Sequence, residues 1–464
     1  MTPSGYFETV SHGRLTREYP LGPAFLDTVA RLSRDELRRL QDRRFRRLMK
    51  RAWQVPFYRR LWTARGLSAA DIRGLDDIGK LPAYGKADLM RSVEEHPPFG
   101  DYHGLDTGGE HPPVVFHTTS GTTGRPQPLF WGPRSRELQN LLLARGYLFQ
   151  GVRSSDVVQS VYGHGVINGG HYVRETFLHF VNALFISAGT GVETRSRTQV
   201  EYMRDFGVTV LVGFVDYIRH LAEVAREMGL EPGRDIKLRL IIGHRGRESR
   251  DELSRAWGGA EVFDWYGVGD TGLIAAEGPD HAGLYVMEDA HHVDIIDPDT
   301  HTPVPDGEAG NICVTVLGKD DVFPVVRFNT NDLSSVLPGA SPLGLTLRRL
   351  AGFLGRSDNM VKLRGINVYP TAIGDRLRGQ PRATGEFLCR VDRNEGRDEM
   401  TVAIEVRADP SEHAALTAAY RERLRAGLGV EVSVELVAPG ALAPLTGIER
   451  RQKPIRLIDN RAKG

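Results

Sequence analysis

Short apolar runs alternate with amphipathic stretches through the middle of the chain, between residues 114 and 330. The run at 208–212 precedes a helical pattern over 217–228, and the run at 238–242 ends at Gly243. Strand-like runs that alternate with helical patterns predict a mostly parallel sheet covered by helices. Ligands of such sheets bind just beyond the carboxyl ends of the strands. Residues that directly follow these runs are therefore the first candidates for a site.

The two ends of the chain show different patterns. Residues 34–50 place leucine and phenylalanine at helical spacing on a basic background, which predicts a solvated amphipathic helix, with nucleic-acid binding as the weaker alternative. Residues 283–337 indicate antiparallel strands. Residues 355–464 predict a small α+β domain, with strands near 386–392, 400–407 and 430–437 and a helix at 410–428. We therefore expect an α/β protein with a large N-terminal domain (1–354), which contains a β-rich subdomain, and a small mobile C-terminal domain (355–464).

Composition limits the classes of protein that fit. The 464 residues exceed what one hydrophobic core usually supports. A formal net charge of +1 leaves no electrostatic footprint for nucleic acid or an anionic membrane. The only cysteines, Cys313 and Cys389, lack metal-ligand spacing, no signal peptide is visible, and no apolar run approaches the ~20 residues that span a bilayer. These features predict a cytoplasmic protein that binds neither nucleic acid nor membrane.

A loop rich in hydroxyl groups follows the apolar run that ends at Phe116. Its core is Thr118, Thr119, Ser120, Gly121, Thr122, Thr123 and Gly124. Glycine lets the backbone approach a ligand closely, and successive N–H groups with Ser and Thr hydroxyls can surround a phosphate. The loop lacks the Gly-Lys-Ser/Thr ending of the Walker loop. Taken alone it could also be a solvated turn.

Five blocks, in this order, resemble those of the adenylate-forming superfamily of acyl-CoA synthetases, nonribosomal peptide adenylation domains and luciferases. The phenylacetate–CoA ligase group is the most similar within it, and the resemblance extends over nearly the whole chain. The blocks are the loop at 118–124, Trp265-Tyr-Gly-Val-Gly-Asp270, Val326-Arg-Phe-Asn-Thr-Asn-Asp332, Gly355-Arg-Ser-Asp-Asn-Met-Val-Lys-Leu-Arg-Gly-Ile-Asn-Val-Tyr-Pro370 and Gln452-Lys-Pro-Ile-Arg456.

The resemblance implies that ATP activates an aromatic or arylalkyl carboxylic acid to an acyl-adenylate, which then transfers its acyl group to CoA. A carboxylate cannot expel oxide, so AMP becomes the leaving group. Negative charge that collects at the α-phosphorus is stabilised by fixed positive groups. The implied cofactors are ATP, Mg²⁺ and CoA, the partner is a small-molecule acid, and a homodimer is consistent with the group.

The resemblance also implies roles for individual residues. Lys453 would bridge carboxylate and α-phosphate oxygens, Asp332 would accept both ribose hydroxyls, and Arg356 would meet ribose or phosphate oxygens. Alternatives are a solvated tail lysine, a turn aspartate and a polar linker. The loop at 118–124, Tyr266 and Gly267 are also implied to bind the nucleotide. Asp358 is implied to be the hinge about which the small domain rotates. Lys362 and Arg364 would face the site only after that rotation, and simple surface charge is the alternative for both.

Some positions depart from the family pattern. Asp270 stands where the family has a Mg²⁺-binding Glu; it would share the metal with Thr122, or else cap a following helix. Asn331 replaces a glycine and is expected to adopt the left-handed conformation. The polar residues His244, Arg245 and Asp216 predict a polar substituent on the acid, since buried polar groups need partners.

The expected substrate residues follow the predicted strands, although any single histidine among them is more often structural. They are Tyr162, His164, Asn168, Gly169, Phe214, Asp216, Gly243, His244, Arg245, Gly269 and Thr271. His281, His291 and His292 lack the flanking cysteines that some relatives use for zinc. They are predicted to be strand-facing, with no structural zinc.

Two other functions compete with the CoA ligase. The same adenylating residues could serve another nucleophile, such as an amine, a carrier-protein thiol or nitrite. A degenerate nucleotide-binding scaffold is the third interpretation, and retention of Lys453, Asp332, Arg356 and the 118–124 loop argues against it.

Overall fold

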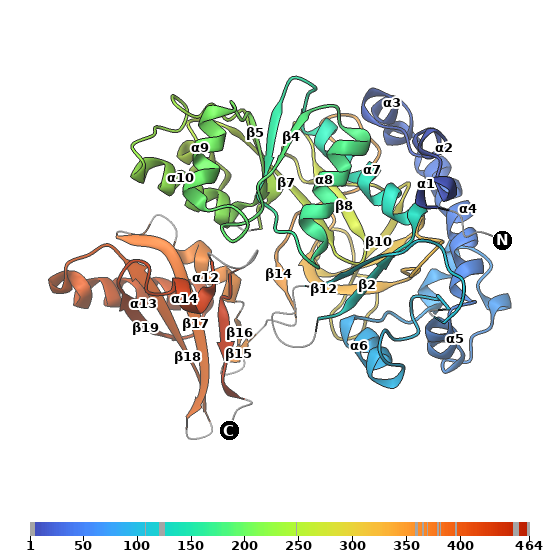
Figure 1. The fold of residues 1–464 in the computed structure, drawn as a ribbon. Helices are drawn as coiled ribbons and strands as arrows, with labels where there is room; N and C mark the ends of the chain where they lie inside the picture. Colours follow the sequence, from blue (N-terminus) through green and yellow to red (C-terminus); the bar gives the residue numbers. More distant parts are fainter. Residues whose placement is uncertain are drawn as a thin grey trace.

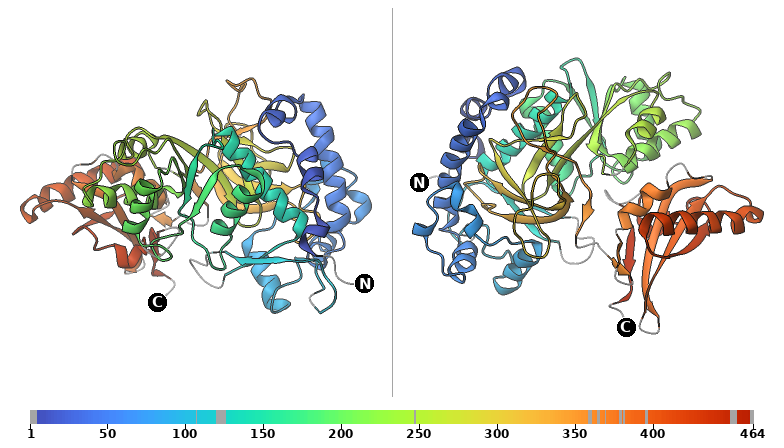
Figure 2. Two further views of the ribbon diagram at one scale, coloured as in Figure 1. Left: turned by 45° about the horizontal axis from the view of Figure 1, so that its top comes forward. Right: turned by 180° about the vertical axis from the view of Figure 1, so that it is seen from behind.

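The protein is described from a computed structural model, in which a large N-terminal part and a smaller C-terminal part are joined close to β14 (Figure 1). The two parts remain distinct when the molecule is turned (Figure 2). The structure describes residues 5–106, 108–119, 126–246, 248–357, 361–363, 366–368, 370–377, 380, 382–394, 397–448 and 454–461.

An eight-stranded sheet forms the centre of the large part, in the order β13-β9-β8-β7-β6-β5-β3-β4. The strands from β4 to β7 are parallel, whereas β8, β9 and β13 continue the sheet antiparallel. Its strands are β3 (Val157–Ser160), β4 (Leu184–Ser187), β5 (Val210–Phe214), β6 (Leu240–His244), β7 (Glu261–Val268), β8 (Gly272–Glu277), β9 (Leu284–Val286) and β13 (Arg349–Leu350).

Helices cover both faces of the parallel strands, because alternate side chains of a strand point to opposite faces. On β5, Val210 and Val212 join a core formed with α7 (Pro133–Phe149) and α8 (Asn168–Phe180), whereas Leu211 joins the core on the other face. That second face is covered by α9 (Ser196–Asp205), α10 (Val215–Glu227) and α11 (Arg250–Ala256).

The β-rich subdomain is a four-stranded antiparallel sheet in the order β10-β11-β12-β14. Its strands are β10 (His291–Ile296), β11 (Gly310–Val316), β12 (Phe328–Ser334) and β14 (Gly355–Arg356). The hairpin of β1 (Val115–Thr118) and β2 (Pro128–Trp131) lies beside it (Figure 1).

The N-terminal segment is helical. Its α-helices are α1 (Tyr6–Thr9), α2 (His12–Glu18), α3 (Gly22–Asp27), α4 (Arg34–Ala52), α5 (Pro56–Thr63) and α6 (Lys86–Glu95), with 3₁₀ turns η1 (Val29–Arg31), η2 (Ala69–Asp71) and η3 (Leu75–Lys80). Helix α4 starts at a capping box, in which Ser33 and Glu36 satisfy each other's backbone N–H groups. Its buried stripe includes Leu37, Phe45 and Leu48, which confirms the predicted amphipathic helix.

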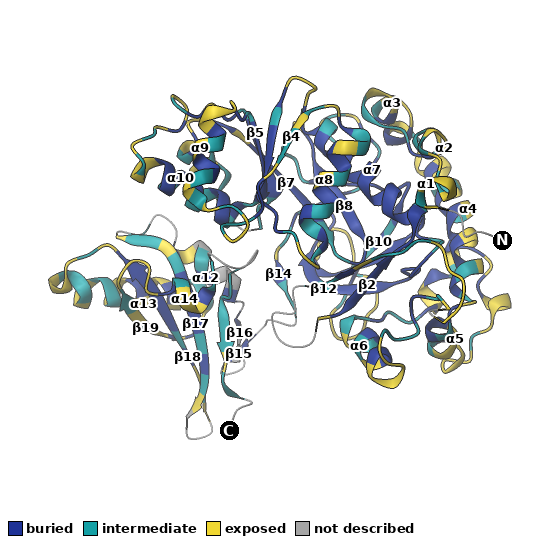
Figure 3. Ribbon diagram, in the orientation of Figure 1, coloured by how far each residue is buried: buried dark blue, intermediate teal, exposed yellow. Residues whose placement is uncertain are grey.

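The C-terminal part has its own core around a mixed sheet, in the order β19-β18-β17-β20. Its elements are β15 (Val361–Leu363), β16 (Ile366–Val368), α12 (Pro370–Leu377), β17 (Ala383–Asn394), β18 (Arg397–Val406), η4 (Pro410–Glu412), α13 (His413–Leu428), β19 (Ser433–Val437), α14 (Ala443–Thr446) and β20 (Leu457–Asp459). Figure 3 shows the buried residues concentrated on the central strands of each part. Over the described residues, no helix is both long and apolar enough to cross a membrane.

The predicted fold class is confirmed: parallel strands covered by helices, a β-rich region and a C-terminal α+β part are all present. The predicted strand at 208–212 is β5, the run at 238–242 is β6, and the predicted helix at 410–428 is η4 followed by α13.

Candidate active site

The hydroxyl-rich loop connects β1 to β2 along the chain. Thr118 pairs with Pro128 at the end of the ladder. Beyond them, the N–H of Thr119 donates to the carbonyl of Gln127 at 3.1 Å, and the N–H of Gln127 donates to the Thr119 hydroxyl at 3.2 Å. Residues 120–125, which include Ser120, Gly121, Thr122, Thr123 and Gly124, lie outside the described part of the chain. The described residues therefore fix where the loop starts and ends.

Gln127 links the base of this loop to Asp270. Its Nε2 donates to Asp270 Oδ1 at 2.6 Å, and the Asp270 side chain is buried in the turn between β7 and β8. Burial raises the pKa of Asp270, because a carboxylate loses its hydration there. Gln127, which follows the loop, therefore contacts Asp270, and a shared role of the loop and Asp270 in binding stays a prediction. No helix follows Asp270, since β8 begins at Gly272, so the alternative of a helix cap is wrong.

A lysine that sequence reasoning missed lies beside Asp270. Lys319 Nζ donates to the Asp270 carbonyl oxygen at 3.0 Å and lies 3.7 Å from the centroid of the Trp131 ring. The lysine is 1% exposed, and burial lowers its pKa to about 7. The sequence held one signal for this residue: lysine is scarce among the 60 basic residues, so each lysine merits attention.

Tyr266, Asp332 and Arg356 form a second polar group. Asp332 and Arg356 are register partners on β12 and β14, and Arg356 Nη1 donates to Asp332 Oδ1 at 2.8 Å. The Tyr266 hydroxyl donates to Asp332 Oδ2 at 2.8 Å. Asp332 is 6% exposed. Residues from three separate sequence blocks therefore converge on one carboxylate.

Asn331 precedes this aspartate with a φ of +59°, which confirms the expected left-handed conformation. Asparagine tolerates that region better than most residues. Its carbonyl oxygen accepts from the Ser357 N–H at 2.8 Å, so the strand stays paired where the family has glycine.

Aromatic rings gather where the parallel strands end. The His244 ring stacks on Phe214 with centroids 5.2 Å apart, and it lies 4.0 Å from the Trp265 ring. Tyr162 lies edge-on to Phe214 at 5.0 Å. These residues come from β5, β6 and β7 and from the segment after β3, so the sheet brings together rings that lie up to about a hundred residues apart. Trp265 was not among the expected substrate residues.

Glycine at 213 and 243 permits this arrangement. The two residues pair across β5 and β6, and a Cβ built on Gly243 would lie 1.8 Å from the Gly213 carbonyl oxygen. A side chain on Gly243 would push the strand ends apart.

The other expected substrate residues make local contacts. His164 Nε2 lies 2.8 Å from the Ser187 hydroxyl, the Arg245 guanidinium donates to the Glu248 carbonyl at 2.7 Å, and Thr271 Oγ1 donates to the Gly272 carbonyl at 2.8 Å. Asn168 accepts from Arg136 in the first turn of α8, where Gly169 follows it. Gly267 and Gly269 lie in the β7–β8 region beside Asp270. The substrate roles of all these residues stay predictions.

Asp216 lies at the contact with the C-terminal part. Its carboxylate is 3.9 Å from Arg456 Nη2, while Arg456 Nη1 pairs with Glu386 at 2.8 Å. Arg219, one turn along α10, also pairs with Glu386 at 3.1 Å. Two carboxylates and two guanidinium groups therefore join α10 to β17 and the segment before β20.

Several predicted residues lie outside the described residues: the hinge Asp358, Arg364 and Lys453. Lys362 lies on β15, but its side chain is not described.

The three histidines considered for zinc are dispersed. His291 and His292 lie on β10, as predicted, whereas His281 lies in the connection between β8 and β9, so its assignment to a strand is wrong. Its φ of +51° lies in the left-handed region, in the turn segment between the two strands.

The fold and this set of residues match known families. The family model described as "AMP-binding enzyme" matches residues 83–317, and that of the "AMP-binding enzyme C-terminal domain" matches 365–461. The chain therefore belongs to the family of AMP-binding enzymes, as the resemblance indicated.

Individual relatives sharpen this assignment. The phenylacetate-coenzyme A ligase of Pseudomonas putida is 30% identical over 437 residues, which cover 90% of this chain and 94% of that protein. The crystal structure of 2-hydroxyisobutyryl-CoA ligase in the postadenylation state with 2-HIB-AMP is similar with a TM-score of 0.83 at 28% identity, covering 96% of this chain and 95% of that one. The same ligase with CoA in the thioesterification state gives a TM-score of 0.68, covering 96% of this chain and 94% of that one.

Proposed function

We propose that this protein activates a carboxylic acid with ATP, forms an acyl-adenylate with release of pyrophosphate, and transfers the acyl group to CoA with release of AMP. The observation that carries the proposal is the convergence of Tyr266 and Arg356 on Asp332, next to the turn that holds Asp270. A carboxylate fixed by two donors keeps its orientation and is suited to a ribose diol.

The phosphates of ATP would lie between the 118–124 loop and Asp270. Gln127 couples the loop to that carboxylate, and Lys319 holds the carbonyl of the same residue. Asp270 fits Mg²⁺, because its carboxylate is a hard oxygen ligand. Burial disfavours the ionised carboxylate, and a bound divalent cation would stabilise that charge. Asp270 and Thr122 would hold the ion, which when bound neutralises phosphate charge. Lys453 would approach the α-phosphate from the C-terminal part.

The acid would lie against the aromatic group of Tyr162, Phe214, His244 and Trp265. Flat rings that stack or meet edge-on favour an aromatic or arylalkyl substrate. His244 adds a polar atom, although its Nδ1 lies 3.1 Å from the Trp265 carbonyl oxygen. We therefore propose an aryl or arylalkyl acid with a polar substituent.

We further propose that residues 1–354 and 355–464 move relative to each other between the two half-reactions, with Asp358 as the hinge. The higher TM-score to the postadenylation structure than to the thioesterification structure supports this proposal. The pairing of β14 with β12 places Gly355 and Arg356 on the sheet of the large part, so we shift the proposed boundary from 354/355 to a point after Arg356, closer to Asp358. Lys362 and Arg364 would reach the site after the rotation.

The test is a hydroxamate-trapping screen of substituted benzoates, phenylacetates and cinnamates with ATP, with and without CoA. One acid class should give acyl-hydroxamate and support ATP–pyrophosphate exchange, and adding CoA should convert the product to a thioester. If no acid of any class supports ATP–pyrophosphate exchange, the proposed activity is excluded.

Two further proposals concern the setting of the protein. Both cysteines are free and buried, in keeping with a reducing compartment such as the cytoplasm. A homodimer stays a prediction, which light scattering on the purified protein checks.

A further inference from the structure

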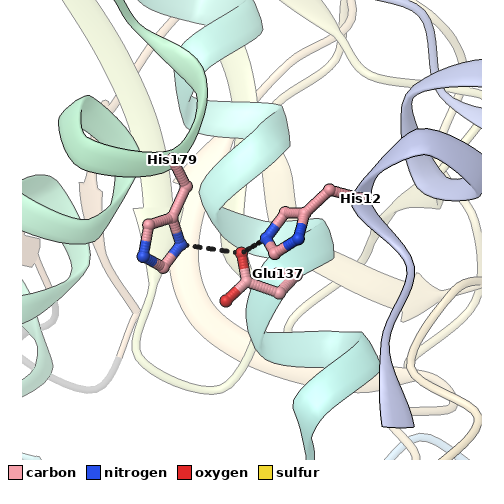
Figure 4. Close-up of side chains that lie close together, drawn as sticks. All are labelled: His12, Glu137 and His179. Carbon is pink, nitrogen blue, oxygen red and sulfur yellow. Dashed lines mark hydrogen bonds and ion pairs between the residues drawn. The ribbon is translucent and has the colours of Figure 1, made fainter. Parts of the chain in front are cut away.

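Two histidines and one glutamate, on three different helices, converge on a single carboxylate oxygen. His12 lies on α2, Glu137 on α7 and His179 on α8, and Figure 4 shows both imidazole rings directed at the carboxylate. His12 Nε2 is 3.0 Å and His179 Nδ1 is 2.9 Å from the same oxygen, Glu137 Oε2. Among the residues that the structure describes, this is the one group of three His, Cys, Asp or Glu whose ligand atoms all lie within 4.8 Å of one another.

The 2.9 and 3.0 Å separations are those of hydrogen bonds, and they are about 0.3 Å shorter than the spacing between ligands of one small cation. Zinc binds histidine nitrogen and carboxylate oxygen at about 2.0–2.2 Å, so neighbouring ligand atoms of a tetrahedral site are roughly 3.3 Å apart. The two rings would then have centroids about 5.2 Å apart. Here the centroids are 5.7 Å apart and the ring planes are inclined by 82°. A small adjustment of the side chains would therefore admit the ion.

The surroundings also suit a bound cation. Glu137 has no exposed side-chain surface, whereas the His12 and His179 side chains are 35% and 23% exposed. The Tyr6 hydroxyl donates to the other carboxylate oxygen, Oε1, at 2.8 Å, which is the outer contact that orients a ligating carboxylate. The nearby Arg136 is paired with Glu175 at 2.6 Å, so its charge is compensated.

We propose that His12, Glu137 and His179 bind a divalent transition metal, zinc in the first place, which fastens the N-terminal helices α1 and α2 to α7 and α8. Two imidazoles and one carboxylate match zinc and disfavour Mg²⁺ or Ca²⁺, which prefer oxygen ligands alone. Three protein ligands leave a fourth position for water on the exposed side. The site is separate from His281, His291 and His292, and it implies no part in the ligase reaction.

Zinc titration of the full-length, chelator-treated protein tests this proposal. We expect one equivalent of zinc to bind, Co²⁺ to give the absorption bands of a four-coordinate site, and zinc to raise the Tm by a few degrees. His12→Ala should weaken zinc binding at least about 100-fold, since even the loss of outer contacts costs 10–100-fold. It should also abolish the Tm shift.

Two further variants make the result decisive. Glu137→Gln keeps the size of the side chain and should behave like His12→Ala; if it fails to fold, the variant of the half-buried His12 decides alone. His171→Ala is the matched control, because it removes a histidine from the separate cluster with His117 and His164. The absence of stoichiometric binding, or zinc binding that is unchanged in His12→Ala, would overturn the proposal, whereas zinc binding in His171→Ala should equal that of the wild type.

Discussion

Arg356 and Asp332 are paired both by backbone register and by side chains: β14 and β12 place them opposite each other, and the guanidinium donates to the carboxylate at 2.8 Å. The two residues lie 24 positions apart in the sequence. Because β14 is the last strand of the large part before the C-terminal part begins, a residue proposed to bind the nucleotide lies directly before the proposed hinge. Nucleotide binding and domain rotation would therefore share one short segment.

Asp332→Asn should lower kcat/KM for ATP by about 10²-fold, because the amide cannot accept from both ribose hydroxyls and loses charge-assisted hydrogen bonds. Steady-state pyrophosphate exchange measures the effect. Asp392→Asn is the control, since that carboxylate accepts from Asn460 within the C-terminal part. An equal loss in both variants would point to a general structural effect instead.

Lys453→Ala should reduce adenylation by about 10²–10³-fold, similar to the removal of one electrostatic donor at a transition state. Thioester formation from preformed acyl-adenylate should be nearly unchanged. The two half-reactions are measured separately, with the exposed Lys80→Ala as control. Pyrophosphate exchange at nearly the wild-type rate in Lys453→Ala would falsify the assignment.

Glu386→Gln should slow adenylation by about 10-fold and thioester formation by less. The reason is that the substitution weakens a charge-assisted contact that joins the two parts. Glu435→Gln, which loses an exposed ion pair with Arg390, is the matched control. Equal slowing of both half-reactions would show that the Glu386 contacts stabilise the protein without favouring one arrangement.

Lys319→Met should lower pyrophosphate exchange by about 10²-fold, because the turn that carries Asp270 loses the donor to its carbonyl, and displacement by about 1 Å can have this effect. The thermal unfolding midpoint, measured alongside, separates misplacement from unfolding. A variant with normal Tm and normal exchange would remove Lys319 from the site.

The pH dependence of stability should contain a contribution from His291. Burial lowers the pKa of this imidazole to about 4, against an unfolded value near 6.5, although Asp289 acts in the opposite direction. The contribution of His291 to the free energy of unfolding is fully present above pH 6.5. It is lost as the pH falls toward 4, because the unfolded chain then binds the proton more readily than the folded one.

His291→Gln removes this term. Between pH 7 and pH 5, the free energy of unfolding of the wild type should fall by about 2 kcal/mol more than that of the variant. Denaturant unfolding at the two pH values measures the difference. Parallel pH profiles would contradict a neutral, buried His291.

Local patterns in the sequence determined most of the fold. Strand runs, helical periodicity and turn residues are encoded within short windows, so β5, β6, α4 and the C-terminal α+β part could be predicted. The loop at 118–124 stood out by its residue types and Asp332 by the resemblance of its sequence block, and their roles toward phosphate and ribose stay predictions. Asn331 was recognisable because so few residue types tolerate positive φ.

Only the tertiary structure decided the contacts between distant segments. Lys319 gained its place because β11 ends beside the β7–β8 turn, and Asp216 faces Arg456 because α10 meets the C-terminal part. His12, Glu137 and His179 come together because three helices pack side by side. No local pattern encodes these pairs, since the free energy that brings them together comes from apolar burial spread over whole elements.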